Sequence, residues 1–281
     1  MQRVKTFGLS LVVLLIAAAL DAQETDRLLV KRIASPVTPD SITFAVSLPA
    51  SYPNGSESYP VVYFLHGMFG NYADGKCQWI ADFFHAQAAR ENIPEVIVVC
   101  PDGGDGFWGD HYDGDPSLET DLLEGLIPYI DQSYRSKKSQ RLILGWSAGG
   151  PGAALFGTKY PDVFKGIVSL DGAILTWEEI LVFHPDMANQ ITGSDSAYYY
   201  EHFSPHTWAV RNRKELSQKK DTSIFLAASF FVANHARFLS LLEEQGIAVK
   251  YVAVNCDHDF VCVMSEVQEE LLVFLSQLFK P

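Results

Sequence analysis

Short apolar runs alternate along the chain with longer stretches in which apolar residues recur at helical spacing. The runs lie at residues 60–65, 94–100, 141–144, 166–170, 223–228 and 248–254, and they are typical of central strands in a parallel sheet. Helical spacing follows at residues 80–91, 118–134, 148–160, 233–245 and 265–279. The alternation predicts an α/β fold with a mostly parallel, doubly wound sheet, whose ligands bind at the carboxyl ends of the strands.

A serine lies in the turn between the expected strand at 141–144 and the expected helix at 148–160. Gly145 and Gly149 flank Ser147 in the spacing Gly-x-Ser-x-Gly. In a strand-to-helix turn this spacing strains the serine backbone and exposes the hydroxyl above the sheet, and only glycines leave room for the adjacent backbone. The pattern alone is weak, but its position between a strand and a helix predicts that Ser147 is a nucleophile.

A serine attacks poorly without a base, so a histidine is expected on a loop after a late strand. His258 follows the strand expected at 248–254 and precedes the last helix, as the chain order of serine, acid and histidine requires. His66 has a different setting. It opens the turn His-Gly-Met-Phe-Gly after the strand at 60–65, and such a turn aims backbone amides at an oxyanion. We expect the Met68 and Ala148 amides to form this oxyanion hole.

Five short motifs follow one another along the chain in a characteristic order. They are Leu-His-Gly-Met-Phe-Gly-Asn at 65–71, Pro-Asp-Gly-Gly at 101–104, Gly-Trp-Ser-Ala-Gly-Gly at 145–150, Phe-Ser-Pro at 203–205 and Asp-His-Asp-Phe at 257–260. Together they resemble the α/β-hydrolase "putative esterase" family, which includes feruloyl and acetyl-xylan esterases, S-formylglutathione hydrolase, enterochelin esterases and mycolyl transferases. The resemblance extends from roughly residue 40 to the end of the chain, and it implies an α/β-hydrolase fold and a serine esterase without specifying the substrate.

The chain departs from this family at the acid of the catalytic triad. Most such esterases place the acid after the strand before the last one, where residues 228–234 contain no carboxylate. Asp171, at the end of the strand 166–170, is the best substitute, and lipases that resemble this fold use that position. A turn aspartate with only a local role is the alternative. Asp257 and Asp259 adjoin the histidine and are weaker candidates, whereas Asn234 is an uncharged candidate for orienting the imidazole.

An aromatic-rich insertion at about residues 174–220 separates two of the expected strands, and we expect it to form a lid over the pocket. A small satellite core that holds the lid in place is the alternative for its aromatic residues. The candidates for substrate contact are His66, Trp146, Trp108 and Trp177, because aromatic rings suit aromatic acyl groups or sugar faces.

The net charge of −13 disfavours a nucleic-acid partner, since phosphate binding needs clustered Lys and Arg. The interpretation as a serine esterase requires no cofactor. It also requires no metal ion, and the acidic loop after Pro101 lacks a spaced ligand set like that of an EF-hand.

Residues 1–22 read as a secretory signal peptide followed by one hydrolase domain at 23–281. Arg3 and Lys5 precede an apolar run that is too short for a comfortable membrane span, and small residues follow it. No cysteine follows that run, so a lipid anchor is not expected, and the protein is expected to be secreted or periplasmic.

The four cysteines allow three disulfide pairings, and the sequence does not choose among them. A buried free thiol is a further alternative for Cys100.

These observations favour a secreted serine carboxylic ester hydrolase that forms an acyl-enzyme on small-molecule or polysaccharide-linked esters, with feruloyl or acetyl groups on carbohydrate expected first. An acyltransferase or a siderophore esterase of the same fold would share every residue named. The missing acid also leaves open a non-catalytic carbohydrate-binding relative.

Overall fold

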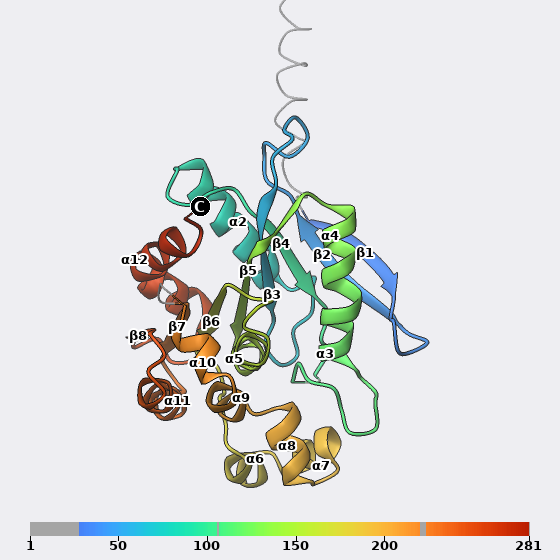
Figure 1. Cartoon of the computed structure of the whole chain (residues 1–281), viewed down its shortest axis with the longest axis vertical. Coiled ribbons are helices and arrows are strands. Elements are labelled where there is room, and N and C mark those ends of the chain that lie inside the picture. Colours follow the sequence, from blue (N-terminus) through green and yellow to red (C-terminus); the bar gives the residue numbers. More distant parts are fainter. Residues whose placement is uncertain (1–27, 106, 220–222, 281) are drawn as a thin grey trace, which may run out of the picture.

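The computed structural model describes residues 28–105, 107–219 and 223–280, and the expected signal peptide lies outside this part of the chain. One sheet of eight strands runs through the described residues in the order β1-β2-β4-β3-β5-β6-β7-β8 (Figure 1). The strands are β1 (Leu28–Ala34), β2 (Ser41–Ser47), β3 (Tyr59–Leu65), β4 (Ile97–Pro101), β5 (Ser136–Trp146), β6 (Gly166–Leu170), β7 (Ile224–Ala228) and β8 (Val249–Ala253).

The strands β4, β3, β5, β6, β7 and β8, in their spatial order, are parallel to one another. This arrangement confirms the expected α/β-hydrolase fold with a mostly parallel sheet. Two strands were not expected from the sequence. β1 pairs antiparallel with β2, and β2 pairs antiparallel with β4. Most of β1 is exposed at the sheet edge, so its residues form no continuous apolar run.

Helices cover both faces of the sheet because the side chains of each central strand alternate between two cores. In β3, Val61 and Tyr63 face one core, whereas Val62 and Phe64 face the other. The second core is closed by α2 (Gly75–Ala89) and α12 (Phe260–Leu278). The first is closed by η1 (Asp121–Leu126), which follows the short helix α3 (Leu118–Thr120), and by α4 (Ile127–Ser133), α5 (Gly149–Lys159) and α11 (Val232–Glu244). Figure 1 shows the helices around the sheet. None of the described helices is long and apolar enough to cross a membrane.

The insertion forms a group of short helices, which are α6 (Trp177–Phe183), α7 (Pro185–Thr192), α8 (Ser196–His202), α9 (Pro205–Arg211) and α10 (Arg213–Ser217). Of these, α6, α7 and α8 lie at one end of the molecule (Figure 1). The buried side chains of this part form a satellite core, in which Trp177 packs against Tyr199 at a ring distance of 5.6 Å, whereas Ala209 and Leu216 of the last two helices join the first core. The satellite core that the sequence offered as an alternative is therefore present.

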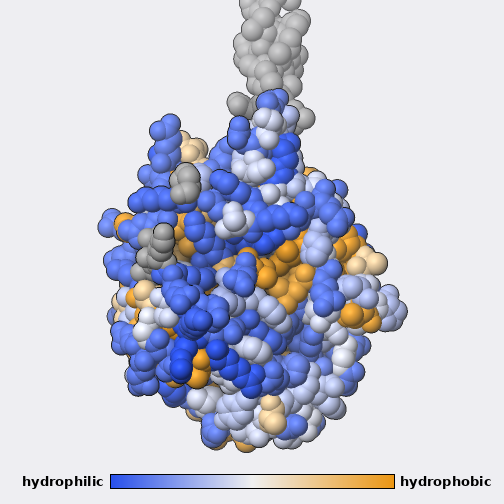
Figure 2. All heavy atoms as spheres, viewed as in Figure 1, coloured by the Kyte–Doolittle hydropathy of each residue, from blue (hydrophilic) through white to orange (hydrophobic). Residues whose placement is uncertain are grey.

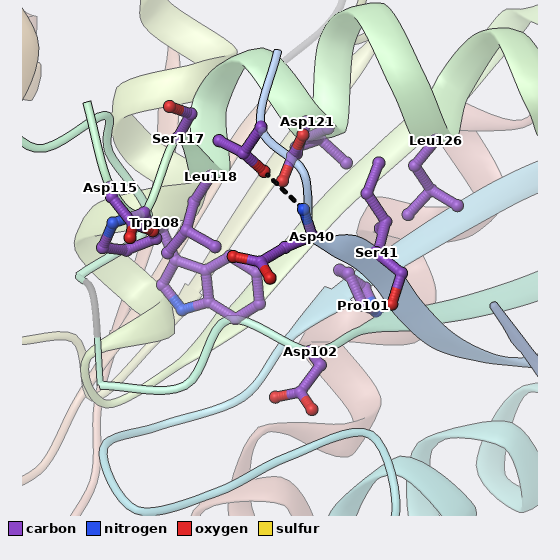
Figure 3. Close-up of a pocket in the computed structure, with 14 residues that line it drawn as sticks. Asp40, Ser41, Pro101, Asp102, Trp108, Asp115, Ser117, Leu118, Asp121 and Leu126 are labelled. Carbon is purple, nitrogen blue, oxygen red and sulfur yellow. Dashed lines mark hydrogen bonds between the residues drawn. The ribbon is translucent and has the colours of Figure 1, made fainter. Parts of the chain in front are cut away.

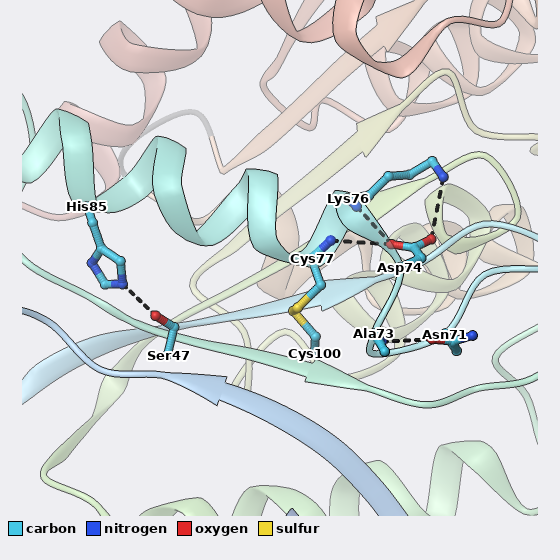
Figure 4. The surroundings of a disulfide bond; sticks show 8 residues. All are labelled: Ser47, Asn71, Ala73, Asp74, Lys76, Cys77, His85 and Cys100. Carbon is cyan, nitrogen blue, oxygen red and sulfur yellow. Dashed lines mark hydrogen bonds and ion pairs between the residues drawn. A yellow bond between two sulfur atoms is a disulfide. The ribbon is translucent and has the colours of Figure 1, made fainter. Parts of the chain in front are cut away.

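The four cysteines form two disulfides, and these correspond to one of the three pairings that the sequence allows. Cys100 is therefore not a free thiol. Figure 4 shows the bond between Cys77, at the start of α2, and Cys100, near the end of β4. Both residues are buried, and Asp74 caps α2 by accepting from the Cys77 amide. The second bond joins Cys256 to Cys262.

The face in Figure 2 is mostly hydrophilic, with one patch of hydrophobic residues near its centre.

Candidate active site

The turn at Ser147 has the sharp geometry that the glycine spacing predicts. Ser147 has a φ of 54°, in the left-handed region that side chains disfavour. A Cβ atom on Gly145 would lie 1.8 Å from the Gly149 carbonyl oxygen, and one on Gly149 would lie 2.1 Å from the Leu65 carbonyl oxygen. Glycines are therefore required on both sides of Ser147, because the start of α5 packs directly on backbone.

Three side chains predicted to form a triad are brought into hydrogen-bonding contact. The Nε2 atom of His258 lies 2.8 Å from the Ser147 hydroxyl oxygen, and its Nδ1 atom lies 2.6 Å from Asp171 Oδ2. His258 belongs to the loop between β8 and α12, as expected. One face of its imidazole is stacked on Trp146, with ring centroids 4.7 Å apart and planes inclined by 18°. The ring therefore has a fixed plane in which its two nitrogens point to opposite partners.

Asp171 directly follows β6, and its carboxylate is fully buried. Its Oδ1 atom accepts hydrogen bonds from the backbone amides of Ser229, Phe230 and Phe231, at 2.8, 2.9 and 3.0 Å. These amides belong to the loop between β7 and α11, where related esterases usually place the acid. In this protein, that loop supplies donors to a carboxylate that comes from the neighbouring strand.

The surroundings of Asp171 favour its charged form. Burial raises the pKa of this carboxyl, but the hydrogen bonds from His258 and from the Phe231 and Ser229 amides outweigh burial. The pKa of Asp171 therefore lies below its ordinary value. The carboxylate is ionised at neutral pH and can hold the His258 Nδ1 proton in place.

The other candidates for the acid have different partners. Asp259 caps α12 by accepting from the Cys262 amide at 2.7 Å. The Asn234 side chain donates to Glu179 of α6. Asp257 is exposed, has a φ of 47° and makes no hydrogen bond with His258 among the described residues. Among these candidates, Asp171 is the only one that forms a hydrogen bond with the imidazole in the described part of the chain.

The two expected oxyanion donors border the serine. Ala148 follows Ser147 in the turn, and a Cβ atom on Gly67, next to Met68, would lie 3.0 Å from Ser147 Cβ. Among the described residues, neither the Met68 nor the Ala148 amide donates to an acceptor. Both amides are therefore available to an oxygen bound beside Ser147, which is what an oxyanion hole requires.

The four residues expected to contact substrate are all buried, with exposed fractions of 2–8%. His66 Nε2 accepts from the Gly103 amide, and Trp108 Nε1 donates to the His66 carbonyl oxygen. These two residues join the oxyanion loop to the loop after β4. Trp146 supports His258, and Trp177 belongs to the satellite core. These side chains are largely covered by protein and pack around the site, so their contact with substrate stays a prediction.

Sequence reasoning missed the aromatic residues that are exposed near the triad. Phe69 follows the oxyanion donor Met68 and is 84% exposed, with its amide donating to Asp105. Phe230 is 67% exposed, and its ring centroid lies 6.0 Å from that of His258. The available signal was the position of both residues on loops that follow strands, at the edge of the sheet where ligands bind.

A separate cavity of about 140 Å³ lies beside Trp108 and is drawn in Figure 3. Carboxylates from several segments line it, including Asp40, Asp102 and Asp121, but no triad residue does. No group of three or more His, Cys, Asp or Glu residues in the described chain is arranged to hold a metal ion. The acidic residues near Trp108 therefore carry no assignment.

The fold and the Ser147, His258 and Asp171 contacts define the class of protein as a serine hydrolase with the α/β-hydrolase fold. The family model described as "Putative esterase" matches residues 35–190, which is more than half of the chain. The chain belongs to this family.

Two curated relatives are informative. An esterase of Mycobacterium tuberculosis is 31% identical over 133 residues, which cover 45% of this chain and 28% of that protein. The chain thus matches less than a third of that relative's length. An acetyl esterase of Caldicellulosiruptor saccharolyticus is 26% identical over 220 residues, covering 73% of this chain and 79% of the relative.

Solved structures support the fold. A ferulic acid esterase superposes with a TM-score of 0.74 at 21% identity, covering 90% of this chain and 98% of the other. S-Formylglutathione hydrolase from Agrobacterium tumefaciens superposes with a TM-score of 0.70 at 20% identity, covering 89% and 95%. At these identities, the similarity concerns the fold alone.

The disulfide between Cys256 and Cys262 spans the loop that carries His258, so its removal is expected to affect catalysis. The Cys256 amide also donates to the Ser229 hydroxyl, next to the Asp171 donors. Changing both cysteines to alanine is expected to lower kcat about tenfold, because small displacements of a catalytic group are costly. Steady-state hydrolysis of 4-nitrophenyl acetate measures this loss.

The matched control changes Cys77 and Cys100 to alanine. This bond joins α2 to β4 within the core, so its loss is expected to lower the free energy of unfolding by about 2–4 kcal/mol with kcat of the folded protein retained. Equal losses of kcat in the two double variants would contradict a specific role for the bond around His258.

Proposed function

We propose that this protein is a secreted serine carboxylic ester hydrolase. The observation that carries the proposal is the continuous chain of hydrogen bonds from Asp171 through His258 to the Ser147 hydroxyl. Ser147 is the nucleophile, His258 is the general base and acid, and Asp171 orients the imidazole. The Met68 and Ala148 amides stabilise the oxyanion.

The reaction proceeds through an acyl-enzyme. Ser147 attacks the ester carbonyl carbon while His258 Nε2 takes its proton, and the negative oxygen is bound by the two amides. His258 then gives the proton to the departing alcohol oxygen. Water enters, loses a proton to His258 and attacks the acyl carbon. The bond between that carbon and Ser147 Oγ then breaks as His258 gives the proton to Oγ, which releases the acid and restores Ser147. The charge on Asp171 stabilises the imidazolium that forms twice in this cycle.

The proposed substrates are esters linked to carbohydrate, with acetyl or feruloyl groups as the acyl part. Support comes from the acetyl esterase that matches most of the chain and, at the level of the fold, from the ferulic acid esterase. We also propose that the protein is secreted or periplasmic, because residues 1–22 have the features of a signal peptide and the two disulfides suit an oxidising compartment.

An acyltransferase of the same fold remains the second candidate, because water and a second alcohol attack the same acyl-enzyme. The hypothesis of a non-catalytic carbohydrate-binding relative was based on the vacant acid position. The hydrogen bond between the buried Asp171 and His258 Nδ1 supports a catalytic protein instead. We propose neither a nucleic-acid partner nor a stable membrane anchor.

Rapid mixing of the wild-type protein with 4-nitrophenyl acetate tests the activity. The expected result is a burst of 4-nitrophenol close to one equivalent, followed by steady turnover, with the acetyl group found on the peptide that contains Ser147. Acetylation elsewhere, or no burst and no turnover, would contradict the proposal. Release of acetate or ferulate from acetylated and feruloylated xylo-oligosaccharides then distinguishes the two acyl groups.

A further inference from the structure

Two phenylalanine rings lie close to the catalytic histidine, in addition to the Trp146 ring that is stacked on it. The Phe231 ring is perpendicular to the His258 imidazole, at 89°, with centroids 5.4 Å apart. The Phe230 ring lies 5.1 Å from that of Phe231 and 6.0 Å from the imidazole. Phe231 is partly buried, whereas Phe230 is 67% exposed. Solvent therefore reaches an aromatic surface that adjoins His258.

This aromatic surface is held rigidly by the triad itself. The backbone amides of both phenylalanines donate to Asp171 Oδ1, at 2.9 and 3.0 Å. The Phe231 carbonyl oxygen accepts from Nδ1 of the buried His235 at 3.1 Å. The rings thus belong to a segment whose backbone is held by hydrogen bonds. Because this segment is already ordered, the protein loses little conformational entropy when a ligand packs on the rings.

The chemistry of the proposed function determines which part of the substrate lies there. When the tetrahedral intermediate collapses, His258 Nε2 must be within hydrogen-bonding distance of the alcohol oxygen that leaves. The carbon atoms attached to that oxygen therefore lie next to the imidazole. Trp146 covers one imidazole face, whereas the exposed Phe230 ring lies 6.0 Å from the imidazole and is the apolar surface that an alcohol held at His258 can contact.

We propose that Phe230 and Phe231 form a subsite for the alcohol part of the ester, which selects alcohols with an apolar face. This inference rests on the proposed function and names the leaving-group side of the same site. In the proposed mechanism the acyl carbonyl oxygen is bound by the Met68 and Ala148 amides, and the residue after Met68, Phe69, is also an exposed aromatic residue.

The same subsite binds an acceptor alcohol once the acyl-enzyme has formed. The alcohol then gives its proton to His258 Nε2 as its oxygen bonds to the acyl carbon. The bond between that carbon and Ser147 Oγ breaks, and the proton passes to Oγ. Alcohols that fit the aromatic surface are expected to compete with water better than methanol does.

The test compares benzyl acetate with methyl acetate. These two esters share the acyl group, and the alcohols that they release have similar acidity. The readout is the ratio of their kcat/KM values in wild type and in Phe230→Ala. The alanine variant keeps the backbone amide that Asp171 binds, and any general damage to the triad cancels in the ratio. The ratio is expected to fall about fivefold, as the loss of one aromatic contact predicts.

Phe183→Ala is the matched control, because Phe183 is 65% exposed at the end of α6 in the insertion. Its ratio is expected to equal that of wild type. Phe230→Leu should restore part of the preference by returning apolar surface. An unchanged ratio in Phe230→Ala, or an equal fall in Phe183→Ala, would overturn the proposal while a burst with 4-nitrophenyl acetate still supports the esterase. Absence of both the burst and steady turnover in wild type would overturn the esterase itself.

Discussion

Replacement of Ser147 with alanine is expected to lower kcat for ester hydrolysis about 10⁶-fold, the scale seen when a serine nucleophile is removed from a triad. The hydroxyl is the only group of the serine that His258 Nε2 contacts, and no acyl-enzyme forms without it. The Met68 and Ala148 amides remain, so the residual rate should still exceed the rate in water. Alanine removes one oxygen and no carbon from a partly exposed side chain, so the fold should be retained.

Steady-state hydrolysis of 4-nitrophenyl acetate measures this loss, and circular dichroism checks the fold. Ser265→Ala is the matched control, because Ser265 is an exposed serine of α12 whose hydroxyl bonds only to the Val261 carbonyl oxygen among the described residues. It should retain wild-type activity. If Ser147→Ala keeps more than about one per cent of kcat, the nucleophile is another residue.

The serine and the histidine were predictable from sequence because each depends on a local pattern. Gly145 and Gly149 are required by contacts with backbone that lies close in space, and the spacing alone indicates the turn. His258 follows from the order of strands and helices along the chain. The β-strands of the parallel core were equally predictable, since burial on both faces demands continuous apolar runs.

The remaining parts depend on contacts between distant segments. The edge strand β1 is largely exposed and therefore carries no apolar run. The tryptophans of the expected pocket are buried, whereas Phe69 and Phe230 are exposed, and residue type does not distinguish these two states. Asp171 was one of several candidates because its partners come from β7–α11 and β8–α12, which only the folded sheet brings together.

The relocated acid can be tested by the dependence of stability on pH. The pKa of Asp171 is lowered in the folded state, so its ionised form stabilises the fold. This stabilisation is fully present above the unfolded pKa, near about 4, and is lost as the pH falls through the lower folded value. Asp171→Asn should therefore lower the free energy of unfolding at pH 7. The difference in this free energy between the variant and wild type should become smaller at a pH below the folded pKa of Asp171. Urea unfolding at pH 7 and at that acid pH measures the two differences.

Asp171→Asn is also expected to lower kcat about 10⁴-fold, as loss of the orienting carboxylate does in a serine protease. Oδ1 of the asparagine can still accept from the Ser229, Phe230 and Phe231 amides, which places the amide nitrogen against His258 Nδ1. That nitrogen donates, so Nδ1 must accept and Nε2 must carry the proton, which is the wrong tautomer for accepting a proton from Ser147. Hydrolysis of 4-nitrophenyl acetate by the folded variant measures the loss.

Asp257→Asn is the matched control for that measurement, because Asp257 is an exposed carboxylate next to His258 in sequence. If nearby negative charge alone assisted the imidazole, both variants would lose activity by similar factors. If the contact at Nδ1 sets the tautomer, only Asp171→Asn falls by orders of magnitude. A near-normal Asp171→Asn would place the acid elsewhere. The esterase assignment would then depend on Ser147 and His258 alone, and the three amides around Oδ1 would have a purely structural role.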